Sequence, residues 1–308
     1  MKNRGCTYPD RVSPADAGLT VAAFYSGRYP HSTEAEWRRR IGAGQVLLNG
    51  LPARPDEKLT RGDALLYHRL AWEEPEAPTD FAVLFEDEDV LALSKPSGLP
   101  VLPGGFFLEN TLLYLVRQRY GHACSPLHRL GRGTSGAILF TRNRRAARSL
   151  ARAMFERRIL KVYLALAGGT TMPDSFTIEA PIGPVRHGLP STVNAYHPGG
   201  RPSISHVRVL RRFAGKSASL LEVTIPTGRP HQIRIHLSYA GFPLVHDPLY
   251  KAGGMPCASG FDDEWTTTPG ATGYFLHSWK IRFPHPAKSE EVEVISPPPA
   301  PLEPPSEL

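Results

Sequence analysis

The 308-residue sequence contains few cysteines and no long apolar run. Its three cysteines, Cys6, Cys124 and Cys257, form no CxxC pair, which argues against a disulfide framework and against a structural zinc site. No stretch of about 18 apolar residues is present that would span a membrane as a helix. The first residues, MKNRGCTYPDRVSPADAG, also lack the apolar region of a secretory signal. We therefore expect a cytoplasmic protein with reduced cysteines.

The charge of the chain is not balanced. Lysine and arginine number 36 against 29 aspartates and glutamates, and the formal net charge is +7. A basic surface attracts polyanions, of which nucleic acid is the commonest in a cytosol. Slightly basic globular proteins are also common, so the charge alone does not choose between nucleic-acid binding and a neutral explanation. The hydrophobic content of 41% suits a globular protein with a buried core.

The N-terminal part predicts an extension followed by a small module. Residues 1–31 form the expected extension, poorly ordered to about residue 23 because no periodicity is visible there. In the module, residues 32–73, the sequence STEAE supplies a helix N-cap and acidic first turn before Trp37. A strand then runs into an Asn49-Gly50 hairpin turn, and a second turn at 61–63 leads into the strand 64–68.

A Pro-rich and acidic linker at 72–79 precedes the larger domain, residues 80–290. Hydrophobic periodicity predicts helices at 110–120 and 143–159 and strands at 81–85, 90–94, 161–167, 192–196, 204–210 and 219–225. In the second helix, capped by Asn143, we expect the apolar face to hold Ala147, Leu150, Met154 and Phe155. The acidic turn 86–89 is interpreted as a solvated turn rather than a metal site. Residues 291–308 are rich in proline and are expected to be disordered.

The sequence HRLGRGTSG at 128–136 is the most informative motif. It resembles the HRLDxxTSG loop of the RluA family of RNA pseudouridine synthases. The matching positions are His128, Arg129, Leu130, Thr134, Ser135 and Gly136. The position of the family's catalytic aspartate holds Gly131.

Two further motifs resemble the same family. TGRPHQIRIH at 227–236 matches TGRxHQIRxH, and KVYLALAG at 161–168 matches KxYxAxxxG with Tyr163 at the position of the family's active-site tyrosine. In the first of these, Pro230 is suited to the first turn of a helix that ends at Gly241. His231 and His236 are five residues apart, which is poor spacing for one metal on one helical face. Weaker agreements extend the resemblance over residues 81–286.

The resemblance implies a fold and an RNA substrate. The fold would be α+β, with a mixed, largely antiparallel central sheet, and the N-terminal module resembles an S4-type RNA-binding unit. There Arg38, Arg39 and Arg40 would face phosphates. The implied partner is a structured RNA, either ribosomal or transfer RNA, with no metal, no cofactor and no membrane, and we expect a monomer.

The resemblance also implies roles for the motif residues. A uridine is flipped out of its stack, detached from ribose C1′, rotated and rejoined through C5. In the family a carboxylate begins the reaction by attacking the nucleoside or taking the ribose 2′ proton. Arg229 would hold that carboxylate ionised, Tyr163 would pack on the base, and Arg129 would fill the gap left by the flipped base. His128 and Thr134 are expected to contact RNA.

Gly131 leaves the chemistry open, because glycine has no side chain to act as nucleophile or base. Three interpretations remain. Another carboxylate enters the site, with Asp247 and Glu222 as candidates; or the chain belongs to a subgroup that works without the aspartate; or it binds RNA without isomerising it. The first two predict an RNA pseudouridine synthase, and the third predicts a catalytically inactive RNA-binding protein or RNA-folding factor.

Overall fold

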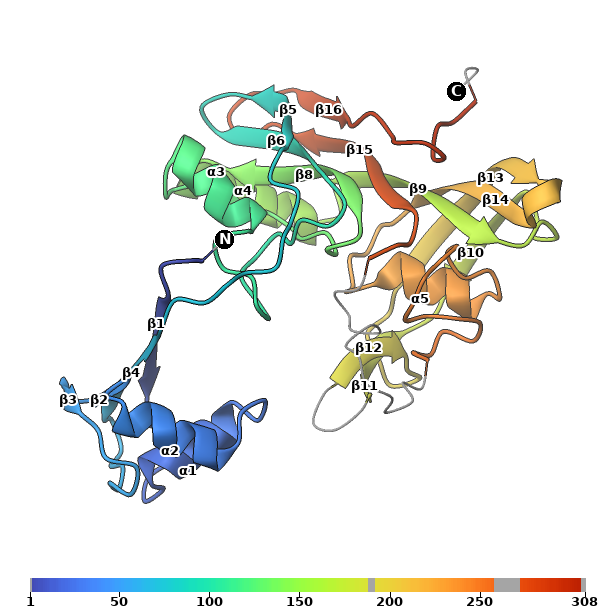
Figure 1. Ribbon diagram of the computed structural model, residues 1–308. Coiled ribbons are helices and arrows are strands. Elements are labelled where there is room, and N and C mark those ends of the chain that lie inside the picture. The colour runs from blue at the N-terminus through green and yellow to red at the C-terminus, as the bar shows by residue number, and fades with distance from the viewer. Residues whose placement is uncertain (1, 188–191, 258–271, 306–308) are drawn as a thin grey trace. The chain divides into compact units, whose positions relative to one another are not determined.

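The computed structural model describes residues 2–187, 192–257 and 272–305, which fall into two compact units (Figure 1). One unit runs to Pro75 and the other begins at Glu76. No helix in these ranges is long and apolar enough to cross a membrane.

The first unit is a four-stranded sheet with two helices. Its strands pair in the order β1-β4-β2-β3. The elements are β1 Cys6–Arg11, α1 Val21–Arg28, α2 Glu34–Gly42, β2 Val46–Leu48, β3 Leu51–Pro52 and β4 Ala64–Arg69. Its core is built on Trp37, whose ring stacks on Tyr25 at 4.7 Å between centroids and meets Tyr67 edge-on.

The expected disorder to residue 23 is wrong. β1 pairs with β4 from Cys6↔Arg69 to Arg11↔Ala64, and α1 begins at the Thr20 cap and buries its apolar side against α2. The sequence did not show this because both elements are short and are stabilised by tertiary contacts. The capping box at Thr33 and Glu36 and the Asn49-Gly50 turn, with φ of 50° and 86°, are confirmed.

The second unit contains a long sheet in the order β10-β13-β14-β9-β15-β8-β6-β5, with β16 on β15 and β7 on β8 (Figure 1). All its pairings are antiparallel except β8 with β15, so the predicted α+β class with a mixed, largely antiparallel sheet is confirmed. The strands are β5 Ala82–Glu86, β6 Val90–Lys95, β7 Ser125–Pro126, β8 Ser135–Thr141, β9 Leu160–Gly168, β10 Ser175–Glu179, β13 Ile204–Phe213, β14 Ala218–Thr224, β15 Leu276–Pro284 and β16 Glu291–Ile295. A separate hairpin joins β11 Ile182–Arg186 to β12 Thr192–Tyr196.

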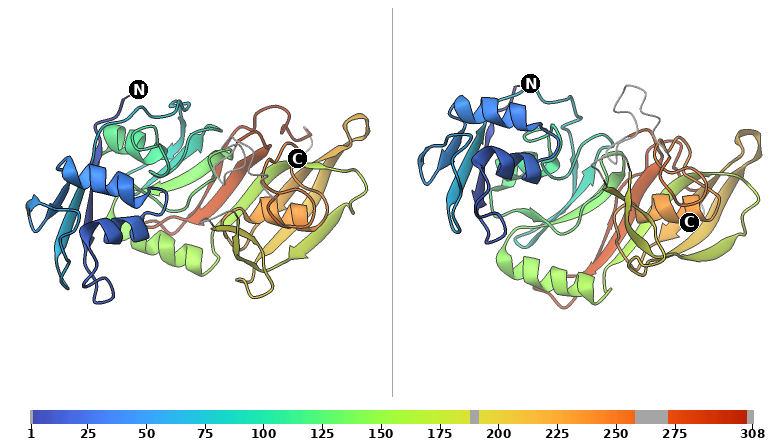
Figure 2. Two further views of the ribbon diagram at one scale, coloured as in Figure 1. Left: turned by 60° about the horizontal axis from the view of Figure 1, so that its bottom comes forward. Right: turned by 90° about the horizontal axis from the view of Figure 1, so that it is seen from below.

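Helices cover both faces of this sheet, which explains why β6 reads as an unbroken apolar run. Leu91 and Leu93 of β6 pack with α3, Leu112–Tyr120, whereas Val90 and Ala92 pack with α4, Arg144–Phe155. Figure 2 shows α4 in yellow-green along β8 and β15. The third helix, α5 Gln232–Tyr239, packs through Ile233 and Leu237 into the same cluster as α3.

The structure corrects two details of this region. Phe155 is 89% exposed, although the spacing placed it on the apolar face of α4; Ala146, Leu150 and Ala153 are the buried residues. The acidic turn is not simply solvated: Asp89 is buried and accepts hydrogen bonds from Asn143 and Arg145, and Asp87 accepts from His285 at 2.6 Å. These carboxylates fix the β5–β6 turn to neighbouring elements.

The expected disordered tail is also wrong where the structure describes it. Residues 291–295 form β16, which pairs with β15 from Pro284↔Glu291 to Lys280↔Ile295. Leu302 is buried in a cluster with Trp279. The remaining residues of the predicted tail, 306–308, lie outside the described part of the chain. The prediction from proline content failed because composition does not show that a single apolar residue such as Leu302 packs against a distant residue such as Trp279.

Candidate active site

A cavity of about 80 Å³ brings the three sequence motifs together. Arg129, Gly131 and Thr134 of the HRLGRGTSG motif lie on its wall with Tyr163 of β9 and Arg229 of the TGR turn. The remaining lining residues are Leu130, Ile225, His231, Gln232, Ile233, Arg234, Tyr274 and Leu276. The residues come from segments about 30 to 60 positions apart that the order β14-β9-β15-β8 places on neighbouring strands.

The loop that carries Gly131 is fixed from beneath by Lys95. The Nζ of this buried lysine donates to the carbonyls of Pro96, Leu99 and Arg132. Burial, with a smaller effect of the Arg132 charge, lowers the pKa of Lys95 to about 7. Thr134 N donates to Gly131 O at 3.1 Å and closes the turn. The loop is therefore rigidly positioned by backbone contacts.

His128 has a structural place in this loop. Its Nε2 accepts a hydrogen bond from the backbone N–H of Leu139, and its side chain does not line the cavity. Burial lowers the pKa of His128 to about 3, so the imidazole is neutral at physiological pH. A neutral ring is also what an accepting Nε2 requires. In the structure His128 thus contacts the backbone of β8 through Leu139, and its expected contact with RNA stays a prediction.

Gln232 organises the TGR turn. Its buried side-chain oxygen accepts from Thr227 Oγ1 at 2.8 Å and from the Arg229 backbone N–H at 3.1 Å. Its amide nitrogen donates to Ile204 O. The helix begins after Pro230, because His231 is the N-cap with a left-handed φ of 58°, so the prediction that Pro230 occupies the first helical turn is wrong. Gly241, with φ of 87°, follows the C-cap as expected.

Arg234 and Asp247 form a buried ion pair behind the cavity. Two hydrogen bonds of 2.7 Å join the guanidinium to the carboxylate, and both side chains are at most 2% exposed. Asp247 Oδ1 also accepts from the backbone N–H groups of Leu249 and Tyr250. The guanidinium lies over the ring of Tyr274, 4.2 Å from its centroid. Arg234 is thereby held with one edge toward Asp247 and one face on an aromatic wall.

Two guanidinium donors at the cavity have no hydrogen-bond partner among the described residues. These are the Nε of Arg229 and the Nη1 of Arg234, and both atoms are buried. Buried donors are normally satisfied, and charged ones are expensive to leave unpaired. The site therefore presents two N–H groups that an acceptor on a bound molecule could satisfy.

Tyr163 and Lys161 lie on the same side of β9. Burial raises the pKa of Tyr163 to about 12, so its phenol stays protonated at neutral pH. Burial also lowers the pKa of Lys161 to about 8. The Lys161 Nζ lies 3.3 Å from the position that a β-carbon on Gly228 would occupy, which places this cation under the TGR turn. Lys161 is the first residue of the KxY motif, and that position was the signal by which it could have been found in the sequence.

No carboxylate lines the cavity within the described part of the chain. Asp247 is committed to Arg234, and Glu222 is bonded to Arg208. Glu222 pairs with Leu164, whereas its neighbour Val223 pairs with Tyr163, so Glu222 lies on the opposite sheet face from the cavity. Neither of the two candidate carboxylates from the sequence is among the described residues that line the cavity.

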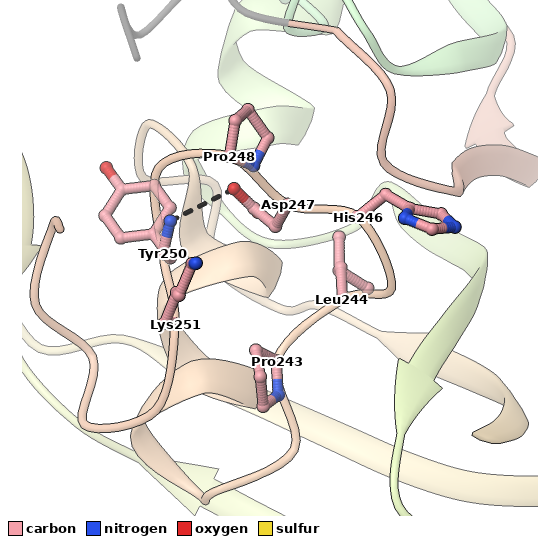
Figure 3. Close-up of a pocket in the computed structure, with 7 residues that line it drawn as sticks. All are labelled: Pro243, Leu244, His246, Asp247, Pro248, Tyr250 and Lys251. Atoms are coloured by element: carbon pink, nitrogen blue, oxygen red, sulfur yellow. Dashed lines mark hydrogen bonds between the residues drawn. The ribbon is translucent and has the colours of Figure 1, made fainter. Parts of the chain in front are cut away.

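A second, more open hollow of about 430 Å³ surrounds Asp247 (Figure 3). Its lining is Pro243, Leu244, His246, Asp247, Pro248, Tyr250 and Lys251. The dashed line in Figure 3 is the bond from Tyr250 N to Asp247, at 3.0 Å. Among the described residues that line this hollow, the carboxylate of Asp247 is already paired with Arg234, so the hollow offers fewer reactive groups than the motif-lined cavity.

The three arginines of the N-terminal unit differ in their environment. Arg38 is engaged by Asp56 and Glu34, and Arg40 donates to Ser32 and lies over Trp37. Arg39 is exposed on α2. The three side chains thus do not form one free cationic face.

Comparison with known proteins decides the family. The family model described as RNA pseudouridylate synthase matches residues 89–239. The RNA pseudouridine synthase 5 of Arabidopsis thaliana is 38% identical over 97% of this chain and 94% of its own length. The chain belongs to the RNA pseudouridine synthase family.

Other members of the family agree. The uncharacterized RNA pseudouridine synthase slr1592 of Synechocystis is 40% identical, covering 91% of this chain and 94% of that protein. The ribosomal large subunit pseudouridine synthase D of Neisseria meningitidis serogroup B is 32% identical, covering 91% and 76%. The solved structure of human RNA pseudouridylate synthase domain containing 1 superposes with a TM-score of 0.55 at 27% identity, over 74% of this chain and 87% of that one. These similarities confirm the family and the fold of the RNA pseudouridine synthase.

Proposed function

We propose that this protein converts uridine to pseudouridine in RNA, using the cavity between Gly131, Tyr163 and Arg229 to hold the flipped base. Membership of the RNA pseudouridine synthase family supports an isomerase acting on RNA. The observation that carries the location of the site is the convergence of all three motifs on one cavity.

The cavity is suited to a uracil ring. The Tyr163 side chain provides an aromatic wall, and the unpaired N–H groups of Arg229 and Arg234 match the acceptor oxygens of a pyrimidine. Arg129 lies at the same cavity and is exposed, so it can occupy the space that the flipped base leaves in the RNA. Stacking and hydrogen bonds of this kind offset the few kcal/mol that base flipping costs.

The class of RNA substrate and the role of the N-terminal unit are further parts of this proposal. Ribosomal RNA or transfer RNA is the substrate class that we propose. The N-terminal unit, with its two helices and sheet, is proposed as an S4-like RNA-binding module in which Arg39 contributes an exposed cation. Phosphate contacts of this type supply affinity without sequence choice.

The competing function is RNA binding without isomerisation, and the observation that favours it is Gly131 in a cavity without a described carboxylate. Release of tritium from RNA labelled at uridine C5 separates the two, because isomerisation replaces the C5–H bond. We expect release from labelled ribosomal or transfer RNA. RNA that binds the protein but releases no tritium would establish the binding function instead.

A further inference from the structure

We propose that Tyr274 is a catalytic residue whose hydroxyl takes the place of the carboxylate that the family has at position 131. This inference rests on the proposed function. Tyr274 lies just before β15, outside the three motifs that meet at the cavity, and its side chain lines the same cavity. A β-carbon built on Gly131 would lie 3.0 Å from the Tyr274 Oη and 3.5 Å from Thr134 Oγ1. The phenol oxygen therefore fills the space into which a side chain at 131 would extend.

The hydroxyl is held in this place from two sides. Its oxygen lies 3.2 Å from Thr134 Oγ1 in a hydrogen bond, and its ring is covered by the Arg234 guanidinium at 4.2 Å. Tyr274 is only 4% exposed. A side chain buried between a hydrogen bond and a cation has few alternative rotamers, which is the preorganisation that a reacting group needs.

The cavity around this oxygen has a surplus of cationic side chains. Arg129, Arg229 and Arg234 line the cavity, and the described lining includes no carboxylate. Asp247 neutralises only Arg234, from behind. The same surplus stabilises the uracil anion that forms when the glycosidic bond breaks.

The step that we assign to Tyr274 is transfer of the ribose C2′ proton. Acting as a general base, the Oη gives its own proton to solvent, regains one at the end of the cycle, and takes the C2′ proton. The C2′–H electron pair forms a C1′=C2′ double bond, and the C1′–N1 pair leaves on uracil N1. After the base rotates, C5 attacks C1′ and the phenol returns its proton to C2′. The proton displaced from C5 moves to N1 through solvent. Every atom and charge of the uridine is then restored in pseudouridine.

The first experiment compares Tyr274→Phe with wild type in single-turnover tritium release, using cellular RNA labelled with [5-³H]uridine. The variant keeps the ring on Arg234 and removes only the oxygen. General acid–base groups contribute about 100-fold or more, so we expect at least that loss of rate with RNA affinity within about threefold. Tyr239→Phe removes a hydroxyl from a half-exposed tyrosine outside the cavity and serves as the matched control. Thermal melts of all three proteins confirm folding.

The second experiment tests whether the Tyr274 hydroxyl occupies the space that a side chain at position 131 would occupy. In Tyr274→Phe the close contact with a β-carbon at 131 is relieved, so adding Gly131→Asp gives the carboxylate room. We expect the double variant to recover at least about tenfold of the rate lost by Tyr274→Phe. Deuterium at ribose C2′ should slow the wild-type reaction.

The outcomes are distinct. An inert wild type overturns the proposed function and this inference with it. An active wild type whose Tyr274→Phe variant keeps its rate, or loses rate and RNA affinity equally, overturns the inference alone. A double variant that recovers none of the lost rate contradicts the inference that Tyr274 occupies the place of a carboxylate at position 131. The absence of a deuterium effect contradicts the transfer of the C2′ proton.

Discussion

Replacing Asp247 by Asn should destabilise the second unit severely while leaving the cavity's chemistry intact in the molecules that remain folded. The substitution keeps the shape of the side chain and an oxygen that can accept from Leu249 N and Tyr250 N. It removes the negative charge that faces Arg234 across two 2.7 Å hydrogen bonds. The guanidinium would then be a buried charge without a counterion.

The size of the effect follows from burial. Both partners are at most 2% exposed, and removing one partner of such a pair costs about 3–5 kcal/mol. For a unit of this size, 1 kcal/mol corresponds to about 2–4 °C in melting temperature, so we expect a decrease of about 6–20 °C. The surface pair of Arg208 and Glu222 is the matched control, because Arg208 is half exposed. Glu222→Gln should change stability by no more than about 1 kcal/mol.

Calorimetry or urea unfolding measures this difference, and single-turnover tritium release at low temperature measures the rate of the folded fraction. An Asp247→Asn protein that loses less than about 1 kcal/mol of unfolding free energy but about 100-fold in rate would refute the reasoning. Asp247 would then be the replacement carboxylate that the sequence suggested.

Three further predictions concern other parts of the account. Tyr163→Ala should abolish turnover and leave RNA affinity within about tenfold, because phosphate contacts carry most of the affinity. Filter binding measures the affinity and tritium release measures turnover. A variant with the wild-type turnover would show that Tyr163 is only a core residue. Reversing the charges of Arg38, Arg39 and Arg40 should weaken RNA binding and reduce its dependence on salt concentration. Most of the change should already be present in Arg39→Glu, because that side chain is exposed. An unchanged dependence of RNA affinity on salt counts against the S4-like assignment. Because the pKa of His128 is lowered to about 3 in the fold and histidine in an unfolded chain has a pKa of about 6.5, the unfolded state binds the additional proton between these values. The unfolding free energy should therefore fall as pH drops below about 6.5, and His128→Asn should reduce that slope; equal slopes would show that His128 is not held neutral.

Several residues that line the candidate site could be selected from the sequence, because each belongs to a local motif. Gly131, Tyr163 and Arg229 were each selected from local patterns, and neighbouring strands bring them to one cavity. Turn and cap signals such as Asn49-Gly50, Thr33 and Asn143 were equally local and correctly placed.

What the sequence could not show depends on distant contacts. Tyr274 stands in no motif, and its relation to Gly131 exists only because β15 lies beside β8. Periodicity placed Phe155 on the apolar face, but the buried face of α4 consists of Ala146, Leu150 and Ala153, and Phe155, the last residue of the helix, is exposed. β1 and β16 are short elements whose stability comes from their pairing with β4 and β15. The lack of periodicity therefore predicted an extension for the first, and the proline content predicted a disordered tail for the second.

The most direct test of the central claim is a map of pseudouridines in RNA from cells with and without this protein, complemented by wild type or by Tyr163→Ala. We predict that at least one ribosomal or transfer RNA position loses its pseudouridine without the protein, regains it with wild type and does not regain it with the variant. Identical maps in all these cells would contradict the assignment of this protein as an active RNA pseudouridine synthase.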